Sequence, residues 1–129
     1  MIVADTNVLA YLCLPGEHTR AAAALLEKDP EWIAPTLWRS EFRNVLMGYM
    51  RRGQITLESA LAFLGEMEKL LRGYDIDSRD VLELARDSGC TAYDCEFVAL
   101  ARSLEVRLVT MDQQILKAFP KIAVSLTGH

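Results

Sequence analysis

The sequence has few of the residues that hold small proteins together covalently or through metals. It contains three cysteines and two histidines among 129 residues, and the cysteines, at positions 13, 90 and 95, form no Cys-x-x-Cys pair. An odd number of scattered cysteines without clustered histidines argues against a disulfide framework and a structural zinc site. We therefore expect the thiols in or near the core of a cytoplasmic protein, where disulfides are rare.

Long apolar runs are also missing. No stretch approaches the roughly 18 apolar residues needed to cross a bilayer, and Asp5 interrupts an N-terminus that has no basic segment before it. Neither a membrane span nor a signal peptide is expected. Hydrophobic residues make up 51% of the chain and charged residues 25%, which is ordinary for a globular protein. The length fits one domain, which we expect over residues 1–129.

The sequence also lacks a surplus of positive charge. The formal net charge is −4 and the pI is about 5.2, which argues against a protein that binds nucleic acid through bulk positive charge. A nuclease remains possible, because an acidic site that holds divalent cations brings its own positive charge to a phosphate. The sequence contains neither a Gly-x-Gly-x-x-Gly motif nor a P-loop, so a nucleotide cofactor is not indicated.

Short apolar runs alternate with segments of helical pattern along the whole chain. Strands are predicted at residues 2–4, 32–34, 74–76, 107–110 and 122–124. Helices are predicted at 7–12, 18–28, 35–52, 56–72, 78–88, 91–104 and from 112 onward. Pro35 is expected in the first turn of the third helix, a position where its missing N–H costs nothing. The alternation predicts the α/β class with a mainly parallel sheet.

Two acidic residues follow predicted strands. Asp5 comes directly after the first strand, and Asp112 comes just after the segment Arg-Leu-Val-Thr that ends at Thr110. Sites in open parallel sheets form at the carboxyl ends of strands, so both acids are expected at the same edge. A local explanation stays open for each, because both precede helical segments and Asp is a favoured N-cap residue.

Glu41 lies on the apolar side of its predicted helix. At 100° per residue it falls within a stripe made by Leu37, Trp38, Phe42, Val45 and Tyr49. Arg39 and Arg43 fall on the opposite side. A carboxylate on a buried face needs a partner. The alternatives are an ion pair with an arginine, an edge position that reaches water, or a functional site.

Asp94 is in the first turn of the helix predicted to begin after Thr91. The spacing from Thr91 to Asp94 resembles a capping box, so a structural role is available. Asp94 also lies at the edge of an apolar stripe, and the helix dipole lowers the cost of its charge there. Glu96, on the same helix, is expected to point away into solvent.

Together, Asp5, Glu41, Asp94 and Asp112 suggest one acidic pocket. Four carboxylates close together repel one another and raise each other's pKa. A divalent cation would relieve that repulsion, and ligation by oxygen alone favours Mg²⁺ or Mn²⁺ over zinc. Phosphoryl transfer is the chemistry that uses such sites.

Four ordered motifs carry a resemblance to a known family. They are DTNVL with Asp5, WRSEFRNVL with Glu41, TAYDCEFVALA with Asp94 and LVTMDQQIL with Thr110 and Asp112. In this order and at these spacings, which span nearly the whole chain, the sequence resembles the PIN-domain family. It is most similar to the VapC-type toxins of prokaryotic toxin–antitoxin systems.

The resemblance implies a three-layer α/β/α sandwich with a parallel sheet of about five strands. It implies an endoribonuclease, dependent on Mg²⁺ or Mn²⁺, whose metal ligands and catalytic residues are Asp5, Glu41, Asp94 and Asp112. The Thr110 hydroxyl would orient a water or ligand on the metal, and Thr6 and Asn7 would shape the rim. The resemblance also implies a homodimer and a cognate antitoxin that enters the acidic pocket.

Two other functions stay open at this point. A PIN fold used only to bind RNA or protein would share the fold without cleaving. A receiver domain has a similar length and an acid after its first strand, but it needs paired acids there, and Thr6 follows Asp5. Arg39 and Arg43 are candidates for contact with nucleic acid or an antitoxin, and an ordinary solvated helix face explains them equally well.

Overall fold

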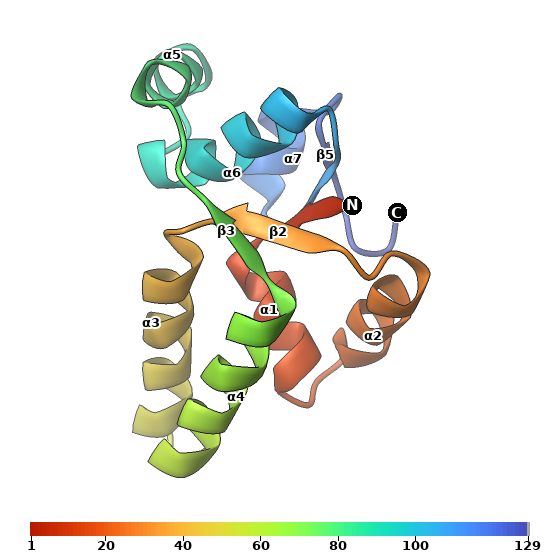
Figure 1. The fold of residues 1–129 in the computed structure, drawn as a ribbon, viewed down its shortest axis with the longest axis vertical. Helices are drawn as coiled ribbons and strands as arrows, with labels where there is room; N and C mark the ends of the chain where they lie inside the picture. The colour runs from red at the N-terminus through yellow and green to blue at the C-terminus, as the bar shows by residue number, and fades with distance from the viewer. Residues whose placement is uncertain (129) are drawn as a thin grey trace.

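A five-stranded sheet in which every pairing is parallel organises the computed structural model, which describes residues 1–128. The strand order is β3-β2-β1-β4-β5 (Figure 1). The strands are β1 (Ile2–Ala4), β2 (Trp32–Pro35), β3 (Arg72–Tyr74), β4 (Leu108–Val109) and β5 (Ala123–Val124). The predicted α/β class and parallel sheet are confirmed.

Helices cover both faces of this sheet. They are α1 (Thr6–Cys13), α2 (Thr19–Lys28), α3 (Trp38–Arg51), α4 (Leu57–Leu70), α5 (Ser78–Ser88), α6 (Ala92–Leu104) and α7 (Gln113–Ala118). Figure 1 shows α1 to α4 on one side of the sheet and α5 to α7 on the other, which is the expected α/β/α arrangement. Within residues 1–128, no helix is long and apolar enough to cross a membrane.

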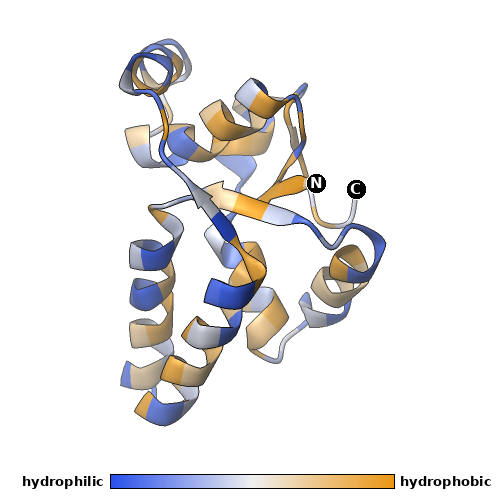
Figure 2. Ribbon diagram, in the orientation of Figure 1, coloured by the Kyte–Doolittle hydropathy of each residue, from blue (hydrophilic) through white to orange (hydrophobic). Residues whose placement is uncertain are grey.

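The core is built around β1 and α6. All three residues of β1 are buried, as parallel strands covered on both faces require. Helix α6 packs against β1 and β2 and buries a run of Cys95, Phe97, Val98, Ala99, Leu100 and Ala101. Figure 2 shows the apolar colouring concentrated in these central elements. Because β1 is central and apolar throughout, the chain delivers Asp5 directly from the core to the edge of the sheet.

The cysteines lie in or beside this core, as predicted. Cys90 and Cys95 are buried and Cys13 is half-buried. Burial raises the pKa of the Cys13 thiol to about 11. A thiol with a raised pKa is seldom a thiolate at neutral pH, so Cys13 is suited to packing rather than to nucleophilic chemistry.

Pro35 does not belong to a helix, and that prediction is wrong. It is the last residue of β2 and pairs with Tyr74, while α3 begins at Trp38. The ladder survives because the N–H of Thr36, rather than that of residue 35, donates to the carbonyl of Tyr74 at 3.0 Å. A proline at the end of a strand therefore costs no ladder hydrogen bond.

The third strand lies earlier than predicted. β3 covers Arg72–Tyr74 instead of 74–76, and α4 ends at Leu70 instead of continuing to residue 72. Arg72 and Gly73 are exposed, so no apolar pattern marks them as a strand. Their extended conformation comes from parallel pairing with Ile33 and Ala34 of β2.

The strand order reverses between β1 and β4. The chain adds β2 and β3 on one side of β1, then returns to add β4 and β5 on the other. Ala4 pairs with Val109, and the N–H of Asp5 donates to the carbonyl of Val109 at 3.1 Å. Ligands of open parallel sheets bind at the carboxyl ends of strands where the order reverses. The topology therefore predicts a ligand site at Asp5 and the residues after β4.

Candidate active site

Asp5 is largely buried, and both of its carboxylate oxygens accept hydrogen bonds. Oδ1 accepts from the backbone N–H of Thr6 at 2.8 Å, and Oδ2 accepts from the hydroxyl of Thr110 at 2.6 Å. Burial raises the pKa of Asp5; these two hydrogen bonds oppose the rise, and the charges of Asp94 and Asp112 add to it. Asp5 is also the N-cap of α1, as the local explanation predicts, since its Oδ1 accepts from the first N–H of that helix. Capping accounts for Oδ1 alone and leaves the contact of Oδ2 with Thr110 unexplained.

Glu41 is tied to the same centre through Thr6. The buried hydroxyl of Thr6 donates to Oε1 of Glu41 at 2.7 Å, joining α1 to α3. The pKa of Glu41 is raised, first by burial and then by the charges of Asp5, Asp94 and Glu96, with the Thr6 hydrogen bond opposing the rise. Within residues 1–128 it forms no ion pair. The ion-pair explanation for a half-buried Glu41 is therefore wrong.

Asp112 combines a structural role with a place in the site. Its Oδ1 accepts from the N–H groups of Gln114 at 2.9 Å and Ile115 at 3.1 Å, which caps α7 as the local explanation predicts. Its own N–H donates to the hydroxyl oxygen of Thr110 at 3.0 Å. In the described chain, Oδ2 of Asp112 accepts no hydrogen bond. Oδ1 of Asp112 therefore caps α7, while Oδ2 is available to bind a ligand.

Asp94 enters the site from the first turn of α6. The Thr91 hydroxyl accepts from the N–H of Asp94 at 3.0 Å, but the return bond of a capping box, from the Thr91 N–H, is not formed within residues 1–128. The pKa of Asp94 is raised by burial and by the charge of Asp112, and the Thr91 hydroxyl opposes the rise. Because the second bond of the capping box is missing, the carboxylate of Asp94 is available for another contact.

These contacts form one hydrogen-bonded chain that runs from Glu41 through Thr6, Asp5 and Thr110 to Asp112. Asp94 couples to it through charge. None of the four acids pairs with a lysine or arginine in the part of the chain that the structure describes. Buried carboxylates without a counter-charge are unfavourable. A bound cation would supply the missing counter-charge.

The donor chemistry fits Mg²⁺ or Mn²⁺, since every available atom is a carboxylate or hydroxyl oxygen. The described residues nevertheless contain no group of three or more His, Cys, Asp or Glu side chains close enough to hold a metal directly. Mg²⁺ usually keeps several waters and binds through one or two carboxylates. The site therefore fits a hydrated cation better than direct ligation by all four acids.

Comparison with known proteins decides the family. The family model for the PIN domain matches residues 2–122. The chain belongs to the PIN domain family. A receiver domain, the alternative from a different class, is thereby excluded.

This PIN domain also resembles individual proteins. Ribonuclease VapC3 of Pyrobaculum aerophilum is 29% identical over 126 residues, covering 94% of this chain and 96% of that protein. The crystal structure of PAE2754 from Pyrobaculum aerophilum has a TM-score of 0.79 at 21% identity, covering 98% of this chain and 89% of that one. VapBC2 from Rickettsia felis, bound to a DNA fragment from their promoter, has a TM-score of 0.71 at 17% identity, covering 97% and 98%. The two structures show that the fold is shared.

Glu96 is a fifth acid near the site of this PIN domain, and its expected exposure to solvent is wrong. The side chain is half-buried, burial raises its pKa, and its charge contributes to the raised pKa of Glu41. No pattern in the sequence indicates this burial, because Glu96 lies about 200° around α6 from Asp94. On that second face, Glu96 lines a pocket together with residues of α5 and of the segment that follows β3.

The remaining predicted residues lie outside the hydrogen-bonded chain. Asn7 is exposed in the first turn of α1 and makes no side-chain hydrogen bond within the described residues. Arg39 is exposed, with its guanidinium 5.6 Å from the centre of the Trp38 ring. Arg43 is exposed at an apolar groove between α3 and α4, lined further by Leu46, Met47, Met50, Ala60, Leu61 and Leu64.

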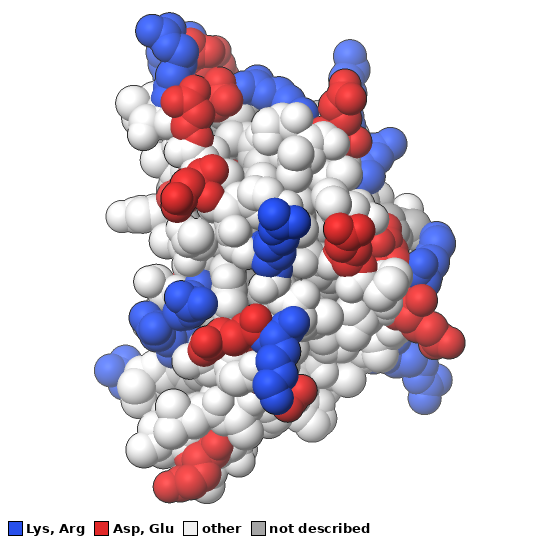
Figure 3. All heavy atoms as spheres, viewed as in Figure 1, with Lys and Arg blue, Asp and Glu red and all other residues white. Residues whose placement is uncertain are grey.

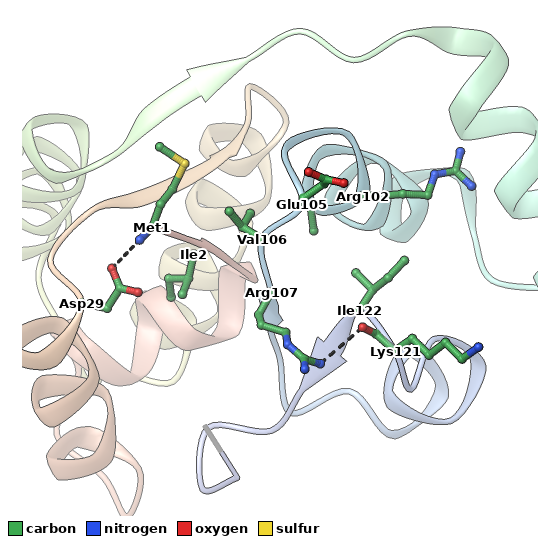
Figure 4. A pocket seen from close by; sticks show the side chains of 10 residues that line it. Met1, Ile2, Asp29, Arg102, Glu105, Val106, Arg107, Lys121 and Ile122 are labelled. Carbon is green, nitrogen blue, oxygen red and sulfur yellow. Dashed lines mark hydrogen bonds and ion pairs between the residues drawn. The ribbon is translucent and has the colours of Figure 1, made fainter.

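A pocket of about 590 Å³ lies at the opposite, amino-terminal edge of the sheet (Figure 4). Two of its charged groups have partners within the pocket: the N-terminal ammonium meets Asp29 at 2.7 Å, and Arg107 donates to the Lys121 carbonyl at 3.3 Å. On the face in Figure 3, basic and acidic side chains are interspersed. The size of this pocket does not make it the active site, because the uncompensated acids lie at the other edge.

Proposed function

We propose that this chain is a metal-dependent endoribonuclease and the toxin of a toxin–antitoxin pair. The observation that carries the proposal is Asp5, a largely buried carboxylate hydrogen-bonded on both oxygens and coupled to three further acids without a basic partner in residues 1–128. The similarity to Ribonuclease VapC3, which covers 94% of the chain, supports RNA as the substrate.

Asp5, Glu41, Asp94 and Asp112 would hold Mg²⁺ or Mn²⁺, directly or through water. The bound cation would supply an activated water and would stabilise negative charge on the scissile phosphate. Thr6 and Thr110 then act as positioning residues. Each donates to one oxygen of Asp5, and each also contacts a second acid, so the carboxylates are held in one relative orientation. Asn7, exposed beside Thr6, remains a candidate for the rim.

The fixed direction of the Thr110 hydroxyl refines its proposed role. Its proton is directed at Asp5 and its oxygen accepts from the Asp112 N–H. A hydroxyl engaged in this way is better suited to orienting two acids than to orienting a water. We therefore assign Thr110 to the support of the ligands, where partners commonly contribute 10- to 100-fold to metal affinity or activity.

The partners follow from the same proposal. A cognate antitoxin would enter the acidic pocket and would also contact the groove between α3 and α4, where Arg43 lies beside an apolar lining. Leu57 and Leu61 of α4 are 53% and 59% exposed, which supports a protein contact on this helix. We further propose a cytoplasmic homodimer of a single domain, residues 1–129. Light scattering of the purified chain measures its oligomeric state.

Cleavage of RNA by the purified chain tests the function. Single-stranded and structured RNA should be cut with Mg²⁺ or Mn²⁺ and left intact with EDTA, and Asp5→Asn should abolish cleavage. Asp75→Asn is the matched control, since Asp75 is exposed at the same edge of the sheet after β3. Full activity in EDTA or in Asp5→Asn would contradict the proposal. Binding of RNA without cleavage by the wild type would favour the alternative, a PIN fold that only binds.

A further inference from the structure

A second pocket lies beside the acidic site. It has a volume of about 250 Å³ and is lined by Ile76, Ser78, Val81, Leu82 and Glu96. These residues come from the segment after β3, from α5 and from α6. The pocket is smaller than the roughly 300–1,000 Å³ of sites for drug-sized ligands, so it suits a single ring system.

The lining of this pocket mixes polar and apolar surface, and Glu96 is its strong hydrogen-bond acceptor. Glu96 is half-buried, and within residues 1–128 it forms neither a hydrogen bond nor an ion pair. The walls from Ile76, Val81 and Leu82 are aliphatic, and the Ser78 hydroxyl can donate or accept. A complementary ligand is flat and apolar on its faces and has N–H donors on one edge. A phosphate or carboxylate would be repelled.

The pocket adjoins the candidate active site along α6. Glu96 lines the pocket from this helix, and Asp94 is two residues earlier in its first turn. Tyr93 lies one turn before Glu96 on the adjoining helix face and is 63% exposed. An exposed aromatic ring of this kind is a stacking surface for an unpaired base.

We propose that this pocket binds an unpaired guanine base of the RNA substrate next to the cleaved bond, with Glu96 accepting from its Watson–Crick edge. The proposal rests on the proposed ribonuclease function and names a specificity-determining residue for it. Only guanine has two adjacent donors on that edge, N1–H and the N2 amino group, which match the two oxygens of a carboxylate. Adenine and cytosine offer one amino group there, and uracil places two carbonyl oxygens there.

Binding to a nuclease-inactive protein tests the assignment without cleavage. Asp5→Asn protein is titrated with a fluorescent single-stranded RNA that contains one guanosine, and with the same RNA carrying inosine at that position. Inosine lacks only the N2 amino group. A well-made bidentate contact discriminates by about tenfold or more, so inosine should weaken binding by about tenfold. Adding Glu96→Gln should remove the difference between the two RNAs.

Two further variants make the result specific. Glu68→Gln, an exposed acid on α4, changes the net charge equally and should preserve the tenfold difference. Leu82→Ala shortens a wall of the pocket at a side chain that is 62% exposed, so the fold should tolerate it. It should weaken binding of both RNAs equally.

The outcomes separate this inference from the proposed function. Equal binding of guanosine and inosine RNA by the Asp5→Asn protein overturns the base pocket, as does a difference that persists with Glu96→Gln. If the wild type cleaves RNA while either result is found, the ribonuclease stands and the pocket fails. If guanosine is preferred through Glu96 but the wild type cleaves nothing, the pocket stands and the nuclease fails.

Discussion

The hydroxyl of Thr110 donates a hydrogen bond of 2.6 Å to Oδ2 of Asp5, although 105 positions separate the two residues in the sequence. The hydroxyl oxygen of Thr110 in turn accepts from the N–H of Asp112 at 3.0 Å. Thr110 is fully buried, and β1 and β4 are neighbours at this point. One hydroxyl therefore sets the relative positions of two acids at the place where the strand order reverses.

Thr110→Val tests this relationship, because valine keeps the shape of threonine without the hydroxyl. Oδ2 of Asp5 and the N–H of Asp112 both lose a partner. The free energy of unfolding, measured with urea, should fall by about 1–3 kcal/mol, and RNA cleavage should fall by about 10- to 100-fold. Thr110→Ser keeps the hydroxyl and should restore most of the activity. Wild-type activity in the valine variant would show that the Thr110 hydroxyl is not needed and that the side chain contributes packing alone.

Glu41→Gln should stabilise the metal-free protein while abolishing cleavage. The variant keeps an oxygen to accept from Thr6 and removes a charge whose pKa burial and neighbouring acids raise. We expect the free energy of unfolding to rise by about 0.5–2 kcal/mol at neutral pH, the range typical of single stabilising substitutions. Thermal unfolding in EDTA measures it. Added Mg²⁺ should stabilise the wild type and not the variant, and a lower Tm for the variant in EDTA would contradict this explanation.

The stability of the metal-free protein should decrease as the pH rises above about 4. Asp5, Glu41 and Asp94 all have raised pKa values, from ordinary values of 3.8, 4.5 and 3.8. Between the ordinary and the raised pKa, the folded state holds more protons than the unfolded state, so raising the pH favours unfolding. Urea unfolding from pH 4 to 8 in EDTA measures the slope. Since other groups also titrate, the comparison is with Glu41→Gln, whose slope should be shallower.

Two glycine substitutions should have opposite effects. Gly89 ends α5 with φ at +77°, a conformation that favours glycine, so Gly89→Ala should destabilise by about 1 kcal/mol. Gly65 lies within α4 with no atom within 4 Å of the site of an added Cβ. Gly65→Ala should therefore stabilise by about 0.5–1 kcal/mol through helix propensity. Denaturant midpoints of the two variants check the signs, and equal shifts would contradict the conformational argument.

Features that depend on near neighbours could be predicted from the sequence. The cap at Thr91, the cap at Asp112 and the helix end at Gly89 are all correct, because their chemistry is local. The exposed strand at Arg72–Tyr74 was misplaced, since its conformation comes from pairing with β2 rather than from its own residues. Pro35 was misassigned for the same reason.

The candidate site likewise has features that the sequence predicts and features that only the tertiary structure shows. The apolar stripe of α3 correctly indicates that Glu41 is partly buried, and the strand ends correctly indicate that Asp5 and Asp112 lie at one edge of the sheet. The sequence does not reveal that Thr6 donates its hydroxyl to Glu41, nor that Glu96 lines a pocket with Ile76 of the segment after β3. Both contacts join segments that are far apart in the chain.

The sequence by itself determined the alternation of strands and helices, the placement of acids at their ends and the family, because periodicity, capping and motif order lie along the chain. Only the tertiary structure decided which hydrogen-bond donors contact each carboxylate and which carboxylate oxygens the helix caps leave available. Asp5 and Asp112 both cap helices, α1 and α7, yet only Asp5 also accepts from the distant hydroxyl of Thr110. The physical reason is that β1 and β4 become neighbours only when the sheet forms, and that pairing brings the Thr110 hydroxyl to Asp5.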